Sequence, residues 1–314
     1  MTTFATGTKI PNDELSFTSM IKNKLLILWS FAILFPGIIK GQAHKQESEL
    51  LAYNIGFGVL STTIGALINK PKGKNTWDCI KNSIWQGAVG GTLQYTGKKL
   101  TYEVNRNQNY AWGWPSKLVH SAGASICQNA AMGNSFGQYW VIDYAALRCN
   151  FTVKKGRVNV QPQFNLLFVF DLAAGLSIGH IDWEKSLQTG AFTFYSNTDY
   201  LGSLEGKPAL GKAYTRSIIY AKYSYENIHK TVAHELVHTY QSNEYRVMNT
   251  YFDPLKAKIK NKTINDIFKY VYVELPYFAG FYGLNYNRDC HYRNFYEFEA
   301  EYFSTNSYVD RGLK

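Results

Sequence analysis

Two uncharged, glycine-rich runs constrain the first third of the chain more than any other feature. Residues 50–69 and 82–97 contain no Asp, Glu, Lys or Arg, and both contain several glycines. Because glycine lets two helix backbones approach closely, we expect two tightly packed, mostly buried helices here and a third close-packed helix within 112–132. A membrane-embedded pair is the alternative, since twenty helical residues span about 30 Å of bilayer.

The pattern changes to a period of two after residue 136. Residues 139–153 alternate between apolar and polar positions, which predicts a strand, and 154–157 (KKGR) reads as a turn. Residues 158–173 then resume as a second strand, so the pair predicts a β-hairpin. Two further short runs rich in aromatic and β-branched residues, 191–195 and 217–223, predict additional strands.

This succession of patterns predicts an α+β fold with four parts along the chain. Residues 1–41 are an N-terminal extension and signal peptide, and 42–135 are a glycine-rich helical region. Residues 136–223 are β-rich and form a hairpin and a small sheet. Residues 224–314 contain the residues with metal-binding and catalytic chemistry that are described below.

The beginning of the chain has the layout of an export signal. Lys22 and Lys24 precede an apolar stretch, residues 25–39, and Met20 stands where such a signal normally begins. We therefore predict that the chain is exported to the periplasm or outer membrane of a Gram-negative bacterium. An uncleaved anchor helix is the alternative interpretation of residues 1–41.

The composition excludes several classes of protein. The net charge is +10, from 33 Lys and Arg against 23 Asp and Glu, but no nucleic-acid-binding motif accompanies it, so no nucleic-acid partner is expected. A membrane surface is also anionic and explains the charge equally well, which makes membrane association a further expectation. The four cysteines include no CxxC pair, which argues against a zinc ribbon or a dense disulfide scaffold.

The strongest motif is the sequence HELVH at residues 234–238. On a helix, His234 and His238 lie on one face, one turn apart, and can share a Zn²⁺ ion. Glu235 between them is suited to act as a general base toward water. The preceding apolar strand, and Ser224 as a candidate N-cap, fit a strand followed by the motif helix.

A catalytic zinc site needs a third protein ligand, and three residues are candidates. Glu244 lies ten residues after His234, about 15 Å along a straight helix, and no glycine turns the chain back. Glu297 lies on a predicted helix, 295–303, with Glu301 on the same face. His291 precedes that helix and is either a ligand, an oxyanion stabiliser or a polar loop residue.

The segment Glu297-Phe298-Glu299-Ala300-Glu301 resembles the E-[FY]-x-A-D pattern on the second zinc helix of gluzincins, most closely the CaaX prenyl protease family. This resemblance implies that Glu297 is the third zinc ligand. It also implies that Glu301 accepts a hydrogen bond from an imidazole whose other nitrogen binds the zinc. Glu301 is one methylene longer than the family's Asp, and the resemblance covers only the two motifs, so it does not transfer a substrate.

A broader likeness concerns most of the chain after the signal. A glycine-rich first half, the segment WPSKLV at 114–119, the helix AHELVHTYQ at 233–241 and the late E-x-E-A helix resemble uncharacterised exported proteins of Bacteroidetes-type bacteria. Together these patterns predict an exported zinc metallopeptidase acting on a peptide or protein substrate. The alternative is a non-catalytic envelope or outer-membrane-associated protein with a structural or degenerate zincin module.

Overall fold

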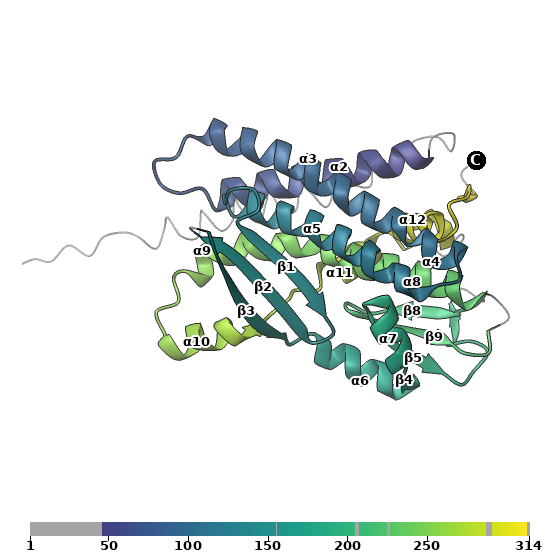
Figure 1. The fold of residues 1–314 in the computed structure, drawn as a ribbon. Coiled ribbons are helices and arrows are strands. Elements are labelled where there is room, and N and C mark those ends of the chain that lie inside the picture. The colour runs from purple at the N-terminus through teal and green to yellow at the C-terminus, as the bar shows by residue number, and fades with distance from the viewer. Residues whose placement is uncertain (1–45, 155, 205–206, 225–226, 287–290, 313–314) are drawn as a thin grey trace, which may run out of the picture. The chain divides into compact units, whose positions relative to one another are not determined.

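The computed structural model describes residues 46–312, apart from 155, 205–206, 225–226 and 287–290. The predicted signal peptide, residues 1–41, lies outside the described residues. The described part belongs to one unit, Gln42–Lys314. Within it, the glycine-rich helices, the strands and the C-terminal helices pack against one another (Figure 1).

Three helices from the glycine-rich region form a layer on one side of this unit. Helix α3 (Thr76–Leu100) packs along both α2 (Gln46–Ile68) and α5 (Gly113–Ala131). The α2–α3 contact is backbone to backbone: a Cβ on Gly91 would lie 2.3 Å from the carbonyl oxygen of Asn54. The predicted close packing is confirmed, but α2 is buried along only one face.

Among the described helices, α2 is long and apolar enough to cross a membrane, with a mean hydropathy of 1.5 over its most apolar stretch. Only 39% of that stretch is buried, so the prediction of a mostly buried helix is wrong for α2. Gly58 of α2 lies against Gly87 and Gly91 of α3, whereas Leu60 and Leu67 of α2 are exposed. Length and composition alone do not separate such a helix from the core helix of a soluble protein.

Replacing Gly91 by Ala should destabilise the protein by about 1–3 kcal/mol, because backbone atoms of α2 occupy the space that the new Cβ requires. Gly56 on α2 provides a matched control, since a Cβ there meets nothing within 4 Å. Gly56→Ala should stabilise the helix by up to about 1 kcal/mol. Urea unfolding of the two variants measures the difference, and equal midpoints would contradict close α2–α3 packing.

The first sheet is built mainly from a three-stranded meander. Its order is β1-β2-β3-β10, and the strands are β1 (Tyr139–Tyr144), β2 (Leu147–Lys154), β3 (Arg157–Asn165) and β10 (Val271–Tyr272). The turn at 154–157 is confirmed. The single strand predicted over 139–153 is wrong, because Ala145 adopts a φ of 49° and starts a two-residue turn. Such turns usually carry Asn or Gly, so the sequence offered no signal for it.

The second predicted strand, 158–173, is also too long. Strand β3 ends at Asn165, whose side-chain oxygen accepts a hydrogen bond from the backbone N–H of Leu167 and turns the chain. Helix α6 (Phe168–Ile178) follows and packs on the second sheet. A short continuous apolar run is compatible with a strand or a helix, so periodicity could not separate the two.

The second sheet has the order β4-β5-β9-β8. Its central strands, β5 (Phe192–Ser196) and β9 (Ser217–Ala221), confirm the two short strands predicted at 191–195 and 217–223. The flanking strands are β4 (His180–Ile181) and β8 (Gly211–Ala213). Strand β8 pairs antiparallel with β9 and forms one edge of this sheet.

The motif helix follows the second sheet directly. Helix α8 (Ile228–Glu244) starts after β9, and its N-cap is Asn227 rather than the predicted Ser224. Helix α12 (Phe295–Thr305) packs against α8. The remaining described elements are α4 (Tyr102–Arg106), α7 (Trp183–Thr189), β6 (Ser203–Leu204), β7 (Lys207–Pro208), α9 (Asp253–Lys256), α10 (Lys262–Tyr270), α11 (Tyr277–Leu284) and the 3₁₀ segments Tyr110–Trp112, Tyr245–Phe252 and His291–Arg293. The predicted α+β class is confirmed.

Candidate metal centre

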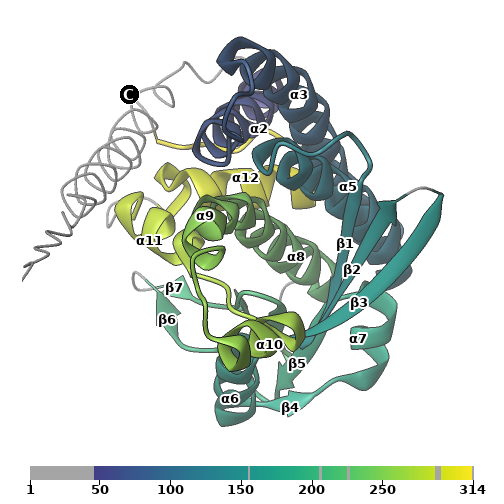
Figure 2. The ribbon, with the colours of Figure 1, turned by 90° about the vertical axis from the view of Figure 1, so that its left-hand side faces the viewer.

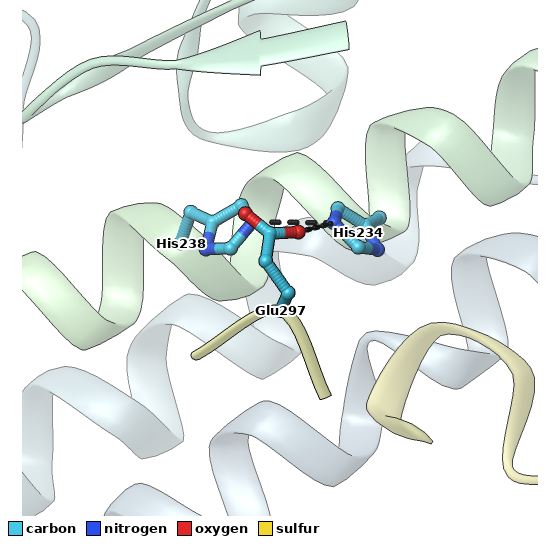
Figure 3. A group of neighbouring side chains, drawn as sticks. All are labelled: His234, His238 and Glu297. Carbon is cyan, nitrogen blue, oxygen red and sulfur yellow. Dashed lines mark hydrogen bonds and ion pairs between the residues drawn. The ribbon is translucent and has the colours of Figure 1, made fainter. Parts of the chain in front are cut away.

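Helix α8 turns both motif histidines toward the same side. Its opposite face carries Val232 and Leu236, which are fully buried against the rest of the core. Burial of this apolar face fixes the rotation of the helix. His234 and His238, four residues apart, therefore both project from the face directed toward α12 (Figure 3).

Helix α12 brings in the third group. Phe295, Phe298 and Phe303 are almost completely buried and anchor this helix in the core. Glu297 is 5% exposed and points toward the two histidines. Glu297 therefore does not lie on a solvent-exposed face of α12.

The three side chains form one group. The His234 and His238 Nε2 atoms are 3.2 Å apart, and Glu297 Oε2 is 3.2 Å from His234 Nε2. Glu297 Oε1 lies 3.4 Å from His238 Nε2. A tetrahedral ion with ligand bonds of about 2.0–2.1 Å needs ligand atoms about 3.3–3.4 Å apart. The donor set and its spacing therefore fit a metal ion of the size of zinc.

The charges in this group favour a cation. Burial lowers the pKa of His234, but hydrogen bonds to Glu297 and Glu301 outweigh burial and raise this pKa to about 10. Burial would raise the pKa of Glu297, yet the charge of His238 and the hydrogen bonds from both histidines hold it well below its usual range. The carboxylates thus stabilise positive charge here, whether protons or a metal ion carry it.

Both histidines have a second hydrogen-bond partner that orients the ring. His238 donates its Nδ1 proton to the Gln241 side-chain oxygen at 2.7 Å. His234 Nδ1 lies 3.5 Å from Glu301 Oε2. Such partners fix the tautomer that leaves Nε2 available to a metal ion. Glu301 therefore lies within contact distance of the ring of His234.

Gln241 connects the candidate centre to the glycine-rich region. Its amide group donates to the Tyr296 carbonyl and to Glu299 Oε2, both at 2.9 Å, which fixes its oxygen toward His238. Glu299 in turn pairs with Lys98 of α3 at 2.7 Å, and both are fully buried. Side chains from three distant parts of the chain therefore determine how His238 is oriented.

Replacing Gln241 by Met should weaken zinc affinity about 10- to 100-fold, because the ring of His238 loses the acceptor that holds its tautomer. A competition titration with a zinc-chelating dye measures this. Thermal unfolding of the metal-free variant is the control, since Gln241 also supports α12. Unchanged zinc affinity would show that His238 does not bind metal through Nε2.

The structure separates the three candidates for the third ligand. Glu244 pairs with buried Lys98 at 2.8 Å and contacts His120, so it belongs to the buried network and not to the candidate centre. His291 lies beside the centre, with Nε2 2.8 Å from Glu297 Oε2. Glu297 alone of the three lies in hydrogen-bond range of both motif histidines.

The group lies on the wall of a cavity with a volume of about 770 Å³. Strand β8 borders one side, and Phe278 and Tyr282 of α11 border another. Glu235 also lines this cavity and is only 7% exposed. Burial raises the pKa of Glu235, and among the described residues no hydrogen-bond partner occupies its carboxylate. A carboxylate of this kind is suited to take up a proton.

Three residues of the site were not identified from the sequence. Gln241 lies three residues after His238, a spacing that places both side chains on one side of the helix. Tyr282 donates a short hydrogen bond to Glu297 Oε1, but tyrosine is too abundant in this chain to be singled out. Gly211 of β8 leaves room for Glu235: a Cβ there would lie 2.5 Å from Glu235 Oε1.

Comparisons with known proteins do not assign this chain to a family. No family model, no curated protein and no solved structure matches the chain. The class that the described site defines is therefore a protein with a His-His-Glu group able to bind a metal ion.

Proposed function

We propose that this protein is a zinc-dependent metallopeptidase. The observation that supports the proposal best is the convergence of His234, His238 and Glu297, whose ligand atoms all lie within 4.8 Å of one another. The same cavity contains an available carboxylate, Glu235. A metal-ligand set, an adjacent base and a cavity of substrate size are the parts that metal-assisted hydrolysis requires.

His234, His238 and Glu297 are the residues that hold the metal in this proposal. When bound, zinc supplies a Lewis acid that polarises a peptide carbonyl and makes water acidic near neutral pH. Glu235 accepts the proton of the attacking water on its carboxylate, and its burial makes that proton uptake favourable. His291 and Tyr282, which both contact Glu297 and line the cavity, are the donors that this proposal assigns to a developing oxyanion.

The border of the cavity suits an extended chain. Strand β8 presents its outer edge along the cavity, and edge strands have unpaired backbone groups that can bind a peptide as an added strand. Gly211 brings this edge close to Glu235. The order of edge strand, motif helix and glutamate helix is also what the resemblance to gluzincins implies, so a zincin-like module is part of the proposal.

The direct test is hydrolysis of a quenched fluorescent peptide library by the full chain. Zinc-loaded protein should cleave peptides, a zinc chelator should abolish cleavage, and added zinc should restore it. Cleavage that persists without metal would contradict the proposal. Zinc bound at unit stoichiometry without any cleavage would instead favour the non-catalytic envelope protein.

Export to the periplasm or outer membrane is part of the same proposal. It rests on the sequence of residues 1–41, which lie outside the described structure. The partner in this proposal is a peptide or protein substrate. Fractionation of cells that express the chain tests the location directly.

A further inference from the structure

The first sheet has its polar face inside and its apolar face outside. Along β2 and β3, Val153 pairs with Val158 and Phe151 pairs with Val160 on the outer face. Val158 is 63% exposed and Val160 is 52% exposed. Helix α5 packs against β1 on the other face of the sheet, as Figure 1 shows.

The inner face of this sheet carries buried charges. Arg148 of β2 is 2% exposed and pairs with Asp143 of β1. Arg216 and Arg246 also pair with Asp143. A half-buried sheet normally turns its apolar face inward, so the exposed valines at the β2–β3 turn need a separate explanation.

Three lysine-rich segments lie at the same end of the unit as that turn and are spread over this end (Figure 2). They are the α2–α3 loop with the first turn of α3 (70–78), the described residues of the β2–β3 turn (153–154 and 156–158), and α9 with the loop that follows it (253–262). All three lie toward the left of Figure 1 and face the viewer in Figure 2. Together these described residues include nine Lys and Arg and two Asp. We call these three segments the basic end.

The basic end also exposes an aromatic side chain. Trp77, in the first turn of α3, is 57% exposed. Val158 on the β2–β3 turn is similarly exposed, so apolar groups lie among the lysines. Tryptophan and small apolar side chains surrounded by basic residues are typical of proteins that insert shallowly into the interfacial region of a bilayer.

We propose that the basic end docks on the surface of an anionic lipid bilayer. The charge complements acidic headgroups, each lysine near such a surface adds to the attraction, and the exposed Trp77 and Val158 reach the apolar boundary below them. A nucleic acid would satisfy the charge, but its phosphate backbone offers nothing to the exposed valines. The proposal is independent of the proposed peptidase activity.

The test is co-sedimentation of the full chain with vesicles made either of phosphatidylcholine alone or of equal parts phosphatidylcholine and phosphatidylglycerol. The chain should bind the anionic vesicles preferentially. Replacing Lys70, Lys72 and Lys74 together by Gln should lower the partition coefficient on the order of 100-fold. Trp77→Ala should weaken binding further without changing its dependence on salt.

A matched variant removes the same charge elsewhere. Lys99, Arg106 and Lys222 lie outside the basic end, and Lys99 is separated from the α2–α3 loop by about 35 Å of helix. Replacing these three by Gln should leave vesicle binding within about threefold of wild type. Both triple variants carry the same N-terminal segment, residues 1–41. Any contribution of this segment to vesicle binding is therefore the same in the two variants.

Three results would overturn the proposal. The first is equal binding to neutral and anionic vesicles, and the second is an equal effect of the two triple variants. The third is displacement of the protein from vesicles by a mixed-sequence RNA at matched phosphate concentration, which would define a general polyanion surface. Circular dichroism of each variant confirms that the fold is retained.

Discussion

Replacing Glu297 by Ala should reduce bound zinc from about one ion per chain to a trace. Glu297 contacts both His234 and His238, so its loss removes one of three ligands and the carboxylate that the two imidazoles share. Loss of a partner that only orients a ligand typically costs 10- to 100-fold in metal affinity, so loss of the ligand itself should exceed about 100-fold. Elemental mass spectrometry of purified protein measures the zinc content.

The control for this experiment is Glu301→Gln on the same helix. Glu301 contacts Nδ1 of His234 and the ammonium group of Lys230 rather than the Nε2 side of the histidines, so this variant should retain zinc with weaker affinity. Zinc retained fully by Glu297→Ala would move the third-ligand role to His291 or Glu301. Wild-type protein that binds no zinc even after reconstitution would contradict a metal centre altogether and favour the non-catalytic envelope protein.

Replacing Glu235 by Gln should lower kcat for peptide hydrolysis about 100- to 10,000-fold, the usual contribution of a general base. The amide has nearly the same shape as the carboxylate but cannot accept the proton. Zinc content should stay at the wild-type value, because Glu235 is not among the three grouped ligands. Both quantities are measured on the same preparation, by hydrolysis of a fluorescent peptide and by elemental mass spectrometry.

Glu235→Asp serves as the comparison, since it keeps a carboxylate that is one methylene shorter and should retain part of the activity. Loss of zinc in Glu235→Gln would mean that Glu235 is a ligand rather than a base. Full activity in Glu235→Gln would contradict the proposed mechanism while leaving the metal centre intact. The two variants therefore separate binding from chemistry.

The glycine-rich helices contribute to the candidate centre as well as to the fold. Lys98 of α3 is fully buried and pairs with Glu299, which holds Gln241 beside His238. Asn54 of α2 also donates to Glu299 at 2.9 Å. The first third of the chain therefore helps to orient a metal-binding histidine, and the described C-terminal region does not form the site by itself.

Local patterns in the sequence were sufficient to predict those helices and strands that depend mainly on residues close in the sequence. The four-residue spacing of His234 and His238 places both on one helix face wherever that helix packs. The close approach of α2 and α3 followed from small residues at helical spacing, and the strands at 191–195 and 217–223 followed from their composition. In each case the structure depends on residues that are close in the sequence or on the size of the side chains.

Local patterns failed where two conformations satisfy them equally. The turn at Ala145 has no glycine or asparagine to mark it, and the apolar run after Asn165 fits a helix as well as a strand. Tertiary contacts decided both, through pairing of β1 with β2 and packing of α6 on the second sheet. The alternating pattern of β2 and β3 also did not reveal which face is exposed.

The third ligand was decided by the tertiary structure. The sequence offered Glu244, Glu297 and His291, and a family resemblance favoured Glu297 without showing its position. Glu297 and His234 are 63 residues apart in the sequence, and the packing of α12 on α8 brings them into contact. Glu244 instead forms a buried ion pair with Lys98. The spacing along a helix determines which side chains share one face of that helix. Which other helix packs against that face depends on the hydrophobic core, and residues from the whole described chain form that core.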